Sequence, residues 1–180
     1  TAPVALELAL LDRAANVMHV GRPCQWATGK GCSKETWTAQ RWNEATCIAM
    51  LNAIKSHVGG RPVRLIGYSG GAYIAAWVAA HMDNVMELVT VAGNLDPESL
   101  MREHSIQAPE QAMPATKLAR LLAATPQVHV IGNQDDVVSD STSRIYAYVG
   151  RDVRTVTAPA THADGWSAFW VKTGAATMLP

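Results

Sequence analysis

The segment that most constrains this chain of 180 residues is Gly67-Tyr68-Ser69-Gly70-Gly71. It follows an apolar, strand-like run and precedes a helical pattern rich in Ala, Ile and Val. A Gly-x-Ser-x-Gly sequence in that position makes a tight turn, which strains the backbone of its serine and exposes the hydroxyl at the end of the strand. Gly67 and Gly71 are expected to prevent side-chain collisions across the turn. The sequence therefore predicts Ser69 as an exposed nucleophile; the alternative is a serine that only caps the helix.

Strand-like and helix-like segments alternate along the chain, which is typical of an α/β fold with a mostly parallel sheet and helices on both faces. Strands are expected at residues 16–20, 63–66, 85–91, 128–131 and 153–157. Long helical patterns cover residues 4–12, 36–57, 71–81, 141–149 and 166–173. The proline-rich segment 94–127 predicts a short lid-like insertion with two short helices. Length and uniform composition predict a single domain over residues 1–180.

The composition excludes several classes of protein. Hydrophobic residues make up 48% of the chain and charged residues 17%, which is too apolar for a disordered protein. The formal net charge is zero and no basic stripe is present, so nucleic-acid binding is not expected. No apolar run approaches the roughly 20 residues that a membrane-spanning helix needs. The cysteines lack the spacing of a zinc site, and no metal or organic cofactor is expected.

A serine nucleophile needs a base, and the base needs an acid that orients it. Asp135 follows the strand expected at 128–131, and His162 follows the strand expected at 153–157. Because parallel strands end at the same edge of a sheet, the loops that carry these residues are expected to converge on Ser69. The other histidines fit a base less well, since they lie inside predicted strands, at helix ends or in the insertion: His19, His57, His81, His104 and His129.

Three aspartates are candidates for the acid. Asp135 comes first out of the turn after Gly132 and is favoured over Asp136, because only one of the two neighbours can face the imidazole. Asp96 is the third candidate, since some serine hydrolases take the acid from the preceding strand. Asp96-Pro97 also matches a helix N-cap followed by proline at the first helical position.

The predicted site suits attack by Ser69 on the carbonyl of a small-molecule acyl substrate. The backbone N–H of Gly70 is expected to stabilise the resulting oxyanion. An ester is the default substrate because the insertion is short, with thioesters and amides as further options. Two alternatives remain: an acyltransferase that uses the same three residues, and a catalytically silent binding module, because a fold alone does not establish activity.

Taken together, these motifs resemble the α/β-hydrolase superfamily from about residue 16 to the C-terminus. The chain also resembles a narrower group of uncharacterised bacterial serine hydrolases, through Arg22-Pro23-Cys24-Gln25, through Cys32 with Trp37-Thr38, and through residues 91–96. The resemblance implies an esterase-like enzyme. In that fold, further strands precede the helix expected at 4–12, and a loop after one of them supplies a second oxyanion donor. We therefore expect that residue 1 is not the natural start, that the second donor lies outside this chain, and that a separate N-terminal fragment is a candidate partner completing the sheet.

Cys24 and Cys32 bracket a short loop, and both belong to sequences that this bacterial group shares. The resemblance therefore favours a disulfide between them, with two free thiols as the alternative. A disulfide is typical of a periplasmic or exported protein, while a cytoplasmic location stays open. Cys47 lies in a predicted helix and is expected to be a buried, apolar side chain.

Overall fold

The computed structural model describes residues 3–26, 29–105 and 111–173. The strands are β1 (Val63–Tyr68), β2 (Val85–Val91), β3 (Gln127–Gly132) and β4 (Val153–Ala158). The helices are α1 (Val4–Leu11), α2 (Lys34–Trp37), α3 (Glu44–Val58), α4 (Gly70–Ala79), α5 (Pro97–Glu103), α6 (Ala115–Leu121), α7 (Ser141–Val149) and α8 (Trp166–Thr173).

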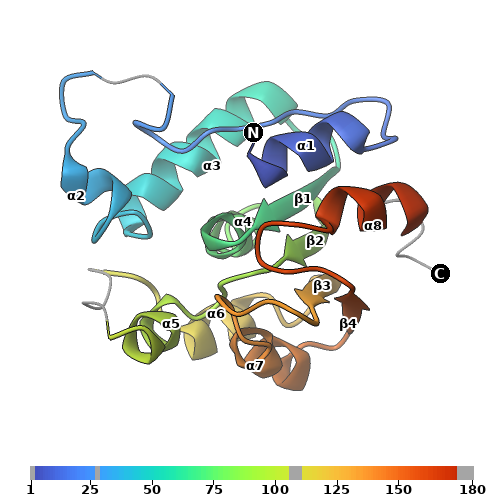
Figure 1. Ribbon diagram of the computed structural model, residues 1–180. Coiled ribbons are helices and arrows are strands. Elements are labelled where there is room, and N and C mark those ends of the chain that lie inside the picture. Colours follow the sequence, from blue (N-terminus) through green and yellow to red (C-terminus); the bar gives the residue numbers. More distant parts are fainter. Residues whose placement is uncertain (1–2, 27–28, 106–110, 174–180) are drawn as a thin grey trace.

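The four strands form one parallel sheet in the order β1-β2-β3-β4. A helix follows each strand, which is the α/β arrangement that the alternating sequence pattern predicts. All four strands therefore point their carboxyl ends to the same edge, and the loops that leave this edge carry the chemistry. In Figure 1, α1 and α8 lie side by side on one side of the sheet.

Helices cover both faces of the sheet, and each face has its own apolar core. On one face, Leu65 and Leu88 pack with buried side chains of α3, α4, α6 and α7. On the other face, Val89 and Val130 pack with the tryptophans of α8 and with Leu8 of α1. The neighbours Leu88 and Val89 belong to opposite cores because successive strand residues point to opposite faces. A central strand that is covered on both sides explains why β2 is nearly all apolar.

The strand predicted at residues 16–20 is wrong. These residues form no strand, and none of the described strands pairs with them. Val17 and Met18 are both exposed, and only Val20, at the end of the segment, packs against the core. Apolar residues alone do not make a strand, because its N–H and C=O groups need a hydrogen-bonding neighbour.

The single helix predicted at residues 36–57 is in fact two helices, α2 and α3. Asn43 interrupts the pattern, since its backbone is extended and its side chain accepts a hydrogen bond from the N–H of Thr46. That contact is a helix N-cap, so α3 begins at Glu44. The C-terminal end agrees with the sequence, because Gly59 follows the last helical residue with a φ of 58°.

The segment 94–127 contains two short helices, α5 and α6, as its prolines predict. Pro97 occupies the start of α5, and Asp96 caps it through the N–H of Ser99. Residues 106–110 of the predicted insertion lie outside the described residues.

Candidate active site

Ser69 lies in the turn between β1 and α4 and adopts the strained backbone that the motif predicts. Its φ is 50°, in the left-handed region that a non-glycine residue rarely adopts. Backbone hydrogen bonds fix the turn, because the Ser69 N–H donates to Val91 and the Ser69 carbonyl accepts from Ala72 and Asn94. The side chain of Ser69 caps no helix, which argues against a merely structural serine.

The two glycines of the motif differ in what they do. A Cβ added to Gly67 would lie 2.6 Å from the Cα of Ala72 and 2.7 Å from the carbonyl oxygen of Gly71. These are backbone atoms, so the turn requires glycine at position 67. A Cβ on Gly71 would meet nothing within 4 Å, so the collision predicted there is wrong. The α-carbon of Gly71 therefore has room for a side chain, whereas that of Gly67 does not.

His162 contacts the Ser69 hydroxyl directly. The distance from Ser69 Oγ to His162 Nε2 is 2.9 Å, within the range of a hydrogen bond. Two side chains hold the backbone of His162: its carbonyl accepts hydrogen bonds from the Tyr68 hydroxyl and from the indole N–H of Trp166. The Tyr68 and His162 rings also lie against each other, with centroids 5.5 Å apart. The imidazole is therefore fixed from β1 and from the start of α8.

The Tyr68 hydroxyl keeps its proton at neutral pH and can therefore donate it in a hydrogen bond. Burial, together with the nearby carboxylates of Asp135 and Asp164, raises the pKa of its phenol to about 12. A protonated phenol can donate to the carbonyl of His162 without bringing a charge close to the imidazole.

Asp135 faces the other nitrogen of the imidazole. Its carboxylate oxygens lie 3.1 and 3.0 Å from His162 Nδ1, and its side chain is 2% exposed. One of these oxygens, Oδ1, also accepts hydrogen bonds from the N–H groups of Val137 and Val138, each at 2.9 Å. The carboxylate is therefore aimed by the turn that follows β3.

The loops after β3 and β4 are held against each other. The N–H of Gln134 donates to the carbonyl of Ala160, and the N–H of Asn133 donates to the carbonyl of Ala158. Gly132 allows this close approach, since a Cβ there would lie 2.5 Å from the Ala160 carbonyl oxygen. The pairing brings Asp135 and His162 together although 27 positions separate them in sequence.

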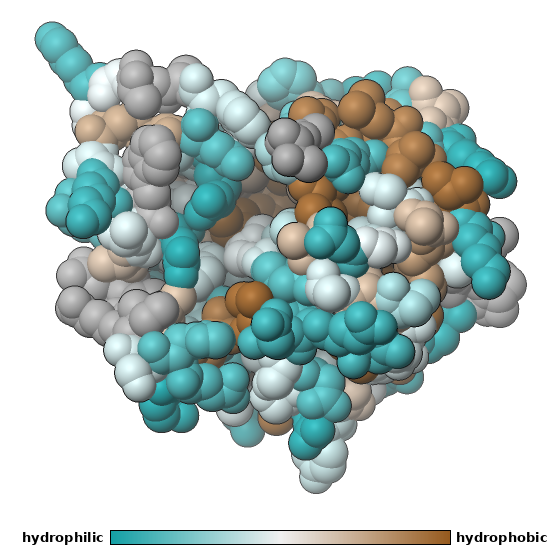
Figure 2. Space-filling model, viewed as in Figure 1, coloured by the Kyte–Doolittle hydropathy of each residue, from teal (hydrophilic) through white to brown (hydrophobic). Residues whose placement is uncertain are grey.

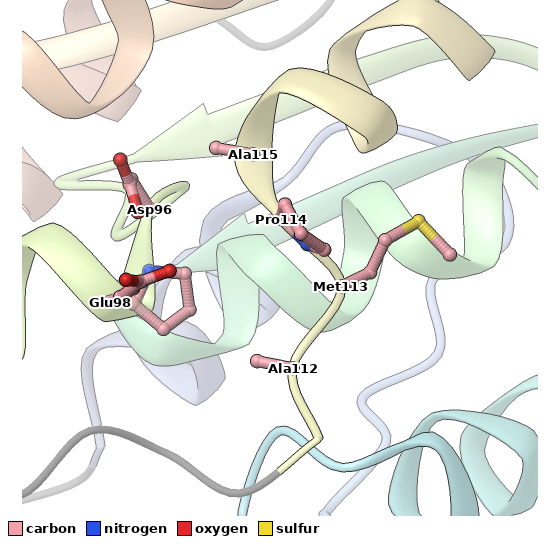
Figure 3. A pocket seen from close by; sticks show the side chains of 7 residues that line it. Asp96, Glu98, Ala112, Met113, Pro114 and Ala115 are labelled. Atoms are coloured by element: carbon pink, nitrogen blue, oxygen red, sulfur yellow. The ribbon is translucent and has the colours of Figure 1, made fainter.

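The other two candidate acids lie elsewhere. Asp136 is exposed, and none of the hydrogen bonds in the described part of the chain joins it to His162. Asp96 accepts a hydrogen bond from Ser99 as the cap of α5. It also lines a cavity of about 70 Å³ between the start of α5 and the segment before α6, together with Glu98, Ala112, Met113, Pro114 and Ala115. Figure 3 shows Asp96 and Glu98 on one side of this cavity and Met113 to Ala115 on the other.

Comparison with known proteins decides the family. The sequence model of the serine hydrolase (FSH1) family matches residues 25–163, which is most of the chain. The chain belongs to the FSH1 serine hydrolase family. Among curated proteins, none matches the chain. The match to FSH1 includes Ser69, Asp135 and His162, and it ends one residue after the histidine.

Solved structures agree on the α/β-hydrolase fold. The chain is similar to an α/β superfamily hydrolase from Oenococcus oeni PSU-1, with a TM-score of 0.56 and 11% identity over 76% of this chain and 70% of that one. It is also similar to the esterase domain of a Rhodothermus marinus protein (TM-score 0.53, 17% identity, 72% of this chain and 63% of that one). An α/β serine hydrolase homologue from Coxiella burnetii has a TM-score of 0.50 and 24% identity over 71% of this chain and 56% of that one. This chain therefore spans less than two thirds of the length of the Rhodothermus and Coxiella proteins.

Sequence reasoning missed the contact of a tryptophan with the turn that carries Ser69. The indole N–H of Trp42 donates a 2.9 Å hydrogen bond to the carbonyl of Gly70. Gly70 lies against the same ring, because a Cβ on it would be 3.1 Å from the indole. Trp42 is 3% exposed and precedes α3, so an element distant in sequence braces the first peptide of α4. Trp42 lies inside the helix predicted at residues 36–57, and a tryptophan in a helical pattern gives no signal of a contact with a turn 28 positions away.

Asn94 is a second residue that the motif does not reveal. It is 1% exposed, and neither atom of its side-chain amide has a hydrogen-bond partner among the described residues. Its backbone N–H donates to the carbonyl of Ser69. The turn from β2 to α5 therefore contacts the nucleophile turn directly, and the positive φ of Ala92 shows how tightly it is made.

Cys24 and Cys32 form a disulfide, in line with the resemblance, and Cys47 is fully buried in α3. Burial raises the pKa of the Cys47 thiol to about 12, so it stays protonated and unreactive. Within the described ranges, no helix combines the length and the apolarity needed to cross a membrane.

Proposed function

We propose that this chain is an esterase-like serine hydrolase in which Ser69, His162 and Asp135 act as nucleophile, base and acid. One observation carries the proposal: Ser69 Oγ, the two imidazole nitrogens and the Asp135 carboxylate form a continuous hydrogen-bonded series. The nucleophile and the base each have the partner that such chemistry requires.

In the first half of the reaction, Ser69 Oγ attacks the carbonyl carbon while His162 Nε2 takes the hydroxyl proton. Asp135 keeps the proton of the neutral ring on Nδ1, which leaves Nε2 free to accept, and it stabilises the imidazolium that forms. The tetrahedral intermediate collapses, and the imidazolium gives its proton to the leaving alcohol. The product of this half is an acyl-serine.

In the second half, water attacks the acyl-serine and His162 takes one of its protons. The second tetrahedral intermediate releases the carboxylic acid, and the proton returns to Ser69 Oγ. An alcohol or an amine in place of water would give acyl transfer with the same three residues. Product analysis with added acceptors distinguishes the two outcomes.

We assign the backbone N–H of Gly70 as one oxyanion donor. Gly70 is the first residue of α4, whose N-terminal N–H groups and dipole favour negative charge. The indole N–H of Trp42 donates to the Gly70 carbonyl and so helps to hold this residue in place. A second donor from outside this chain stays a prediction.

An ester is the substrate class that we favour. Similar folds include proteins described as an esterase domain and as a monoacylglycerol lipase, which supports carboxylic esters without fixing the acyl chain. We also propose that residues 94–127 form a small lid within a single domain, because α5 follows directly from the carboxyl end of β2. A short lid is compatible with a short or medium acyl group.

Reaction with a fluorophosphonate probe tests the function. We expect labelling at Ser69, identified by peptide mass spectrometry, and its loss in Ser69→Ala and His162→Ala. Ser56→Ala is a matched control, since Ser56 is exposed on α3 and bonds only locally. Absence of labelling in the folded wild-type protein would instead support the silent binding module.

A further inference from the structure

Two arginines near the nucleophile turn have no acidic partner. Arg22 precedes the disulfide loop and Arg41 precedes α3, and both are half-buried. Neither forms an ion pair with any residue that the structure describes. The Nε of Arg41 is buried without a hydrogen-bond partner, and its Nη2 contacts only the sulfur of Met101, at 3.8 Å. A buried N–H group without an acceptor is unfavourable, and a ligand that supplies an acceptor would relieve that cost.

The two guanidinium groups also repel each other. Burial lowers the pKa of both side chains, and the charge of Arg22 lowers the pKa of Arg41 further. Like charges in a partly desolvated place destabilise a fold unless an anion lies between or beside them. Arg64, by contrast, pairs with the buried carboxylate of Glu87 at 2.7 Å.

The pair lies close to the reacting serine. The Arg41 guanidinium stacks over the Trp42 ring at 3.9 Å from its centroid, and the same ring bonds to the carbonyl of Gly70. Met101, which Arg41 Nη2 contacts, belongs to α5, the helix that follows β2. Arg41 is therefore at the edge of the sheet from which Ser69 and His162 project. The surface in Figure 2 is hollowed near its middle, and hydrophobic side chains lie at the floor of the hollow.

The segment that carries Arg22 is held in place. Its backbone N–H donates to the side chain of Gln25, its carbonyl accepts from the Gln25 N–H, and the disulfide from Cys24 to Cys32 closes the loop that follows. Arg41 is fixed by its stacking on Trp42. A backbone fixed at Arg22 and a guanidinium fixed at Arg41 reduce the freedom that is lost when a ligand binds.

We propose that Arg22 and Arg41 form a subsite for an anionic group on the acyl substrate, so that the substrate is an ester carrying a carboxylate or a phosphate. This proposal rests on the proposed function, because it identifies which esters reach Ser69. Guanidinium groups bind both anions through paired N–H donors, and such charge-assisted hydrogen bonds are the strong ones. The anion would bind beside Trp42 while the ester carbonyl lies at Ser69.

A pair of esters with acyl chains of equal length tests the subsite. Mono(p-nitrophenyl) adipate carries a terminal carboxylate, and p-nitrophenyl hexanoate has a methyl group there. We expect Arg22→Gln and Arg41→Gln to lower kcat/KM for the adipate ester about tenfold or more, the usual effect of a lost charge-assisted hydrogen bond. Hydrolysis of the hexanoate ester should fall much less, because its terminal methyl group offers the guanidinium groups no hydrogen-bond acceptor.

Two further variants separate binding from structure. Arg41→Lys keeps the charge but loses the planar donors, so it should restore part of the activity on the adipate ester only. Arg144→Gln is the matched control, since Arg144 is exposed on α7 and pairs with Asp140. An equal loss on both esters in Arg22→Gln and Arg41→Gln, or no loss on the adipate ester, would overturn the proposal.

Thermal unfolding of Ser69→Ala measures the subsite without catalysis. Inorganic phosphate and adipate should raise the unfolding temperature of this variant, and the rise should disappear when Arg22→Gln is added. The anion that gives the larger rise identifies phosphate or carboxylate as the natural group. If neither anion raises it, the subsite is refuted. If they raise it but the wild type is not labelled by fluorophosphonate, the subsite stands and the proposed function fails.

Discussion

Replacing Asp135 by asparagine should nearly abolish activity, for a reason that the geometry of its carboxylate makes specific. Oδ1 accepts two backbone N–H groups, from Val137 and Val138, at 2.9 Å each. An asparagine must place its carbonyl oxygen there, because an amide NH₂ cannot accept those bonds. Its NH₂ then occupies the position of Oδ2, which lies 3.0 Å from His162 Nδ1.

An NH₂ group in that position donates to Nδ1 and forces the imidazole proton onto Nε2. Nε2 then cannot take the proton of Ser69, although it still lies near the hydroxyl. The wrong tautomer costs roughly 10⁴-fold in kcat in triads of this kind, or about 5 kcal/mol of activation free energy. The fold should be kept, because the two backbone hydrogen bonds remain.

The assay measures the rate of fluorophosphonate labelling and the rate of p-nitrophenyl hexanoate hydrolysis. The unfolding temperatures of the variant and the wild type are compared first, so that a loss of folding is not read as a loss of catalysis. Asp136→Asn is the matched control, because Asp136 is exposed. The activity of this variant should stay within about twofold of the wild-type activity. A labelling rate for Asp135→Asn above about a tenth of the wild-type rate would refute the tautomer argument, as this corresponds to less than 1.4 kcal/mol. A large loss in Asp96→Asn instead would identify a different acid.

Three further predictions concern stability. Gly67→Ala should lower the free energy of unfolding by about 2 kcal/mol or more, because the added Cβ meets backbone atoms of α4. Gly71→Ala should not lower it, because the added Cβ meets open space. Urea denaturation measures both variants, and equal effects would contradict this account of the turn. Reduction of the Cys24–Cys32 disulfide should cost up to about 2.5 kcal/mol from the loop that it closes, seen as a shift in the urea midpoint; no shift on reduction would show that the loop contributes nothing to global stability. Burial lowers the pKa of His129 from 6.5 to about 4, so the unfolded chain binds this proton more readily and the stability contribution, complete above pH 6.5, is lost as the pH falls towards 4. The wild type should therefore lose about 2 kcal/mol between pH 7 and pH 5 that His129→Gln does not lose, and an equal loss in both would assign the effect to other groups.

The local rules of the sequence predicted most of the elements because each depends on nearby residues. The strand–turn–helix around Ser69 follows from its glycines and from the apolar pattern on either side, and α7 and α8 coincide with the predicted helices at 141–149 and 166–173. The prediction failed at residues 16–20, because a strand needs a second strand to pair with. A local sequence pattern does not show whether a distant segment supplies that partner. It also failed at α2 and α3, where a single side-chain contact from Asn43 divides a continuous helical pattern.

The positions of Ser69, Asp135 and His162 just after β1, β3 and β4 were sufficient to nominate the site, because the loops that follow parallel strands lie at one edge of the sheet. Only the tertiary structure decided between the adjacent aspartates, because the turn after β3 buries Asp135 against the imidazole and exposes Asp136. It alone brought Trp42 under Gly70 and left Arg22 and Arg41 together without a carboxylate. Sequence specifies which backbone a residue favours and which chemistry it carries; the packing of distant segments fixes which groups meet and which charges stay unpaired.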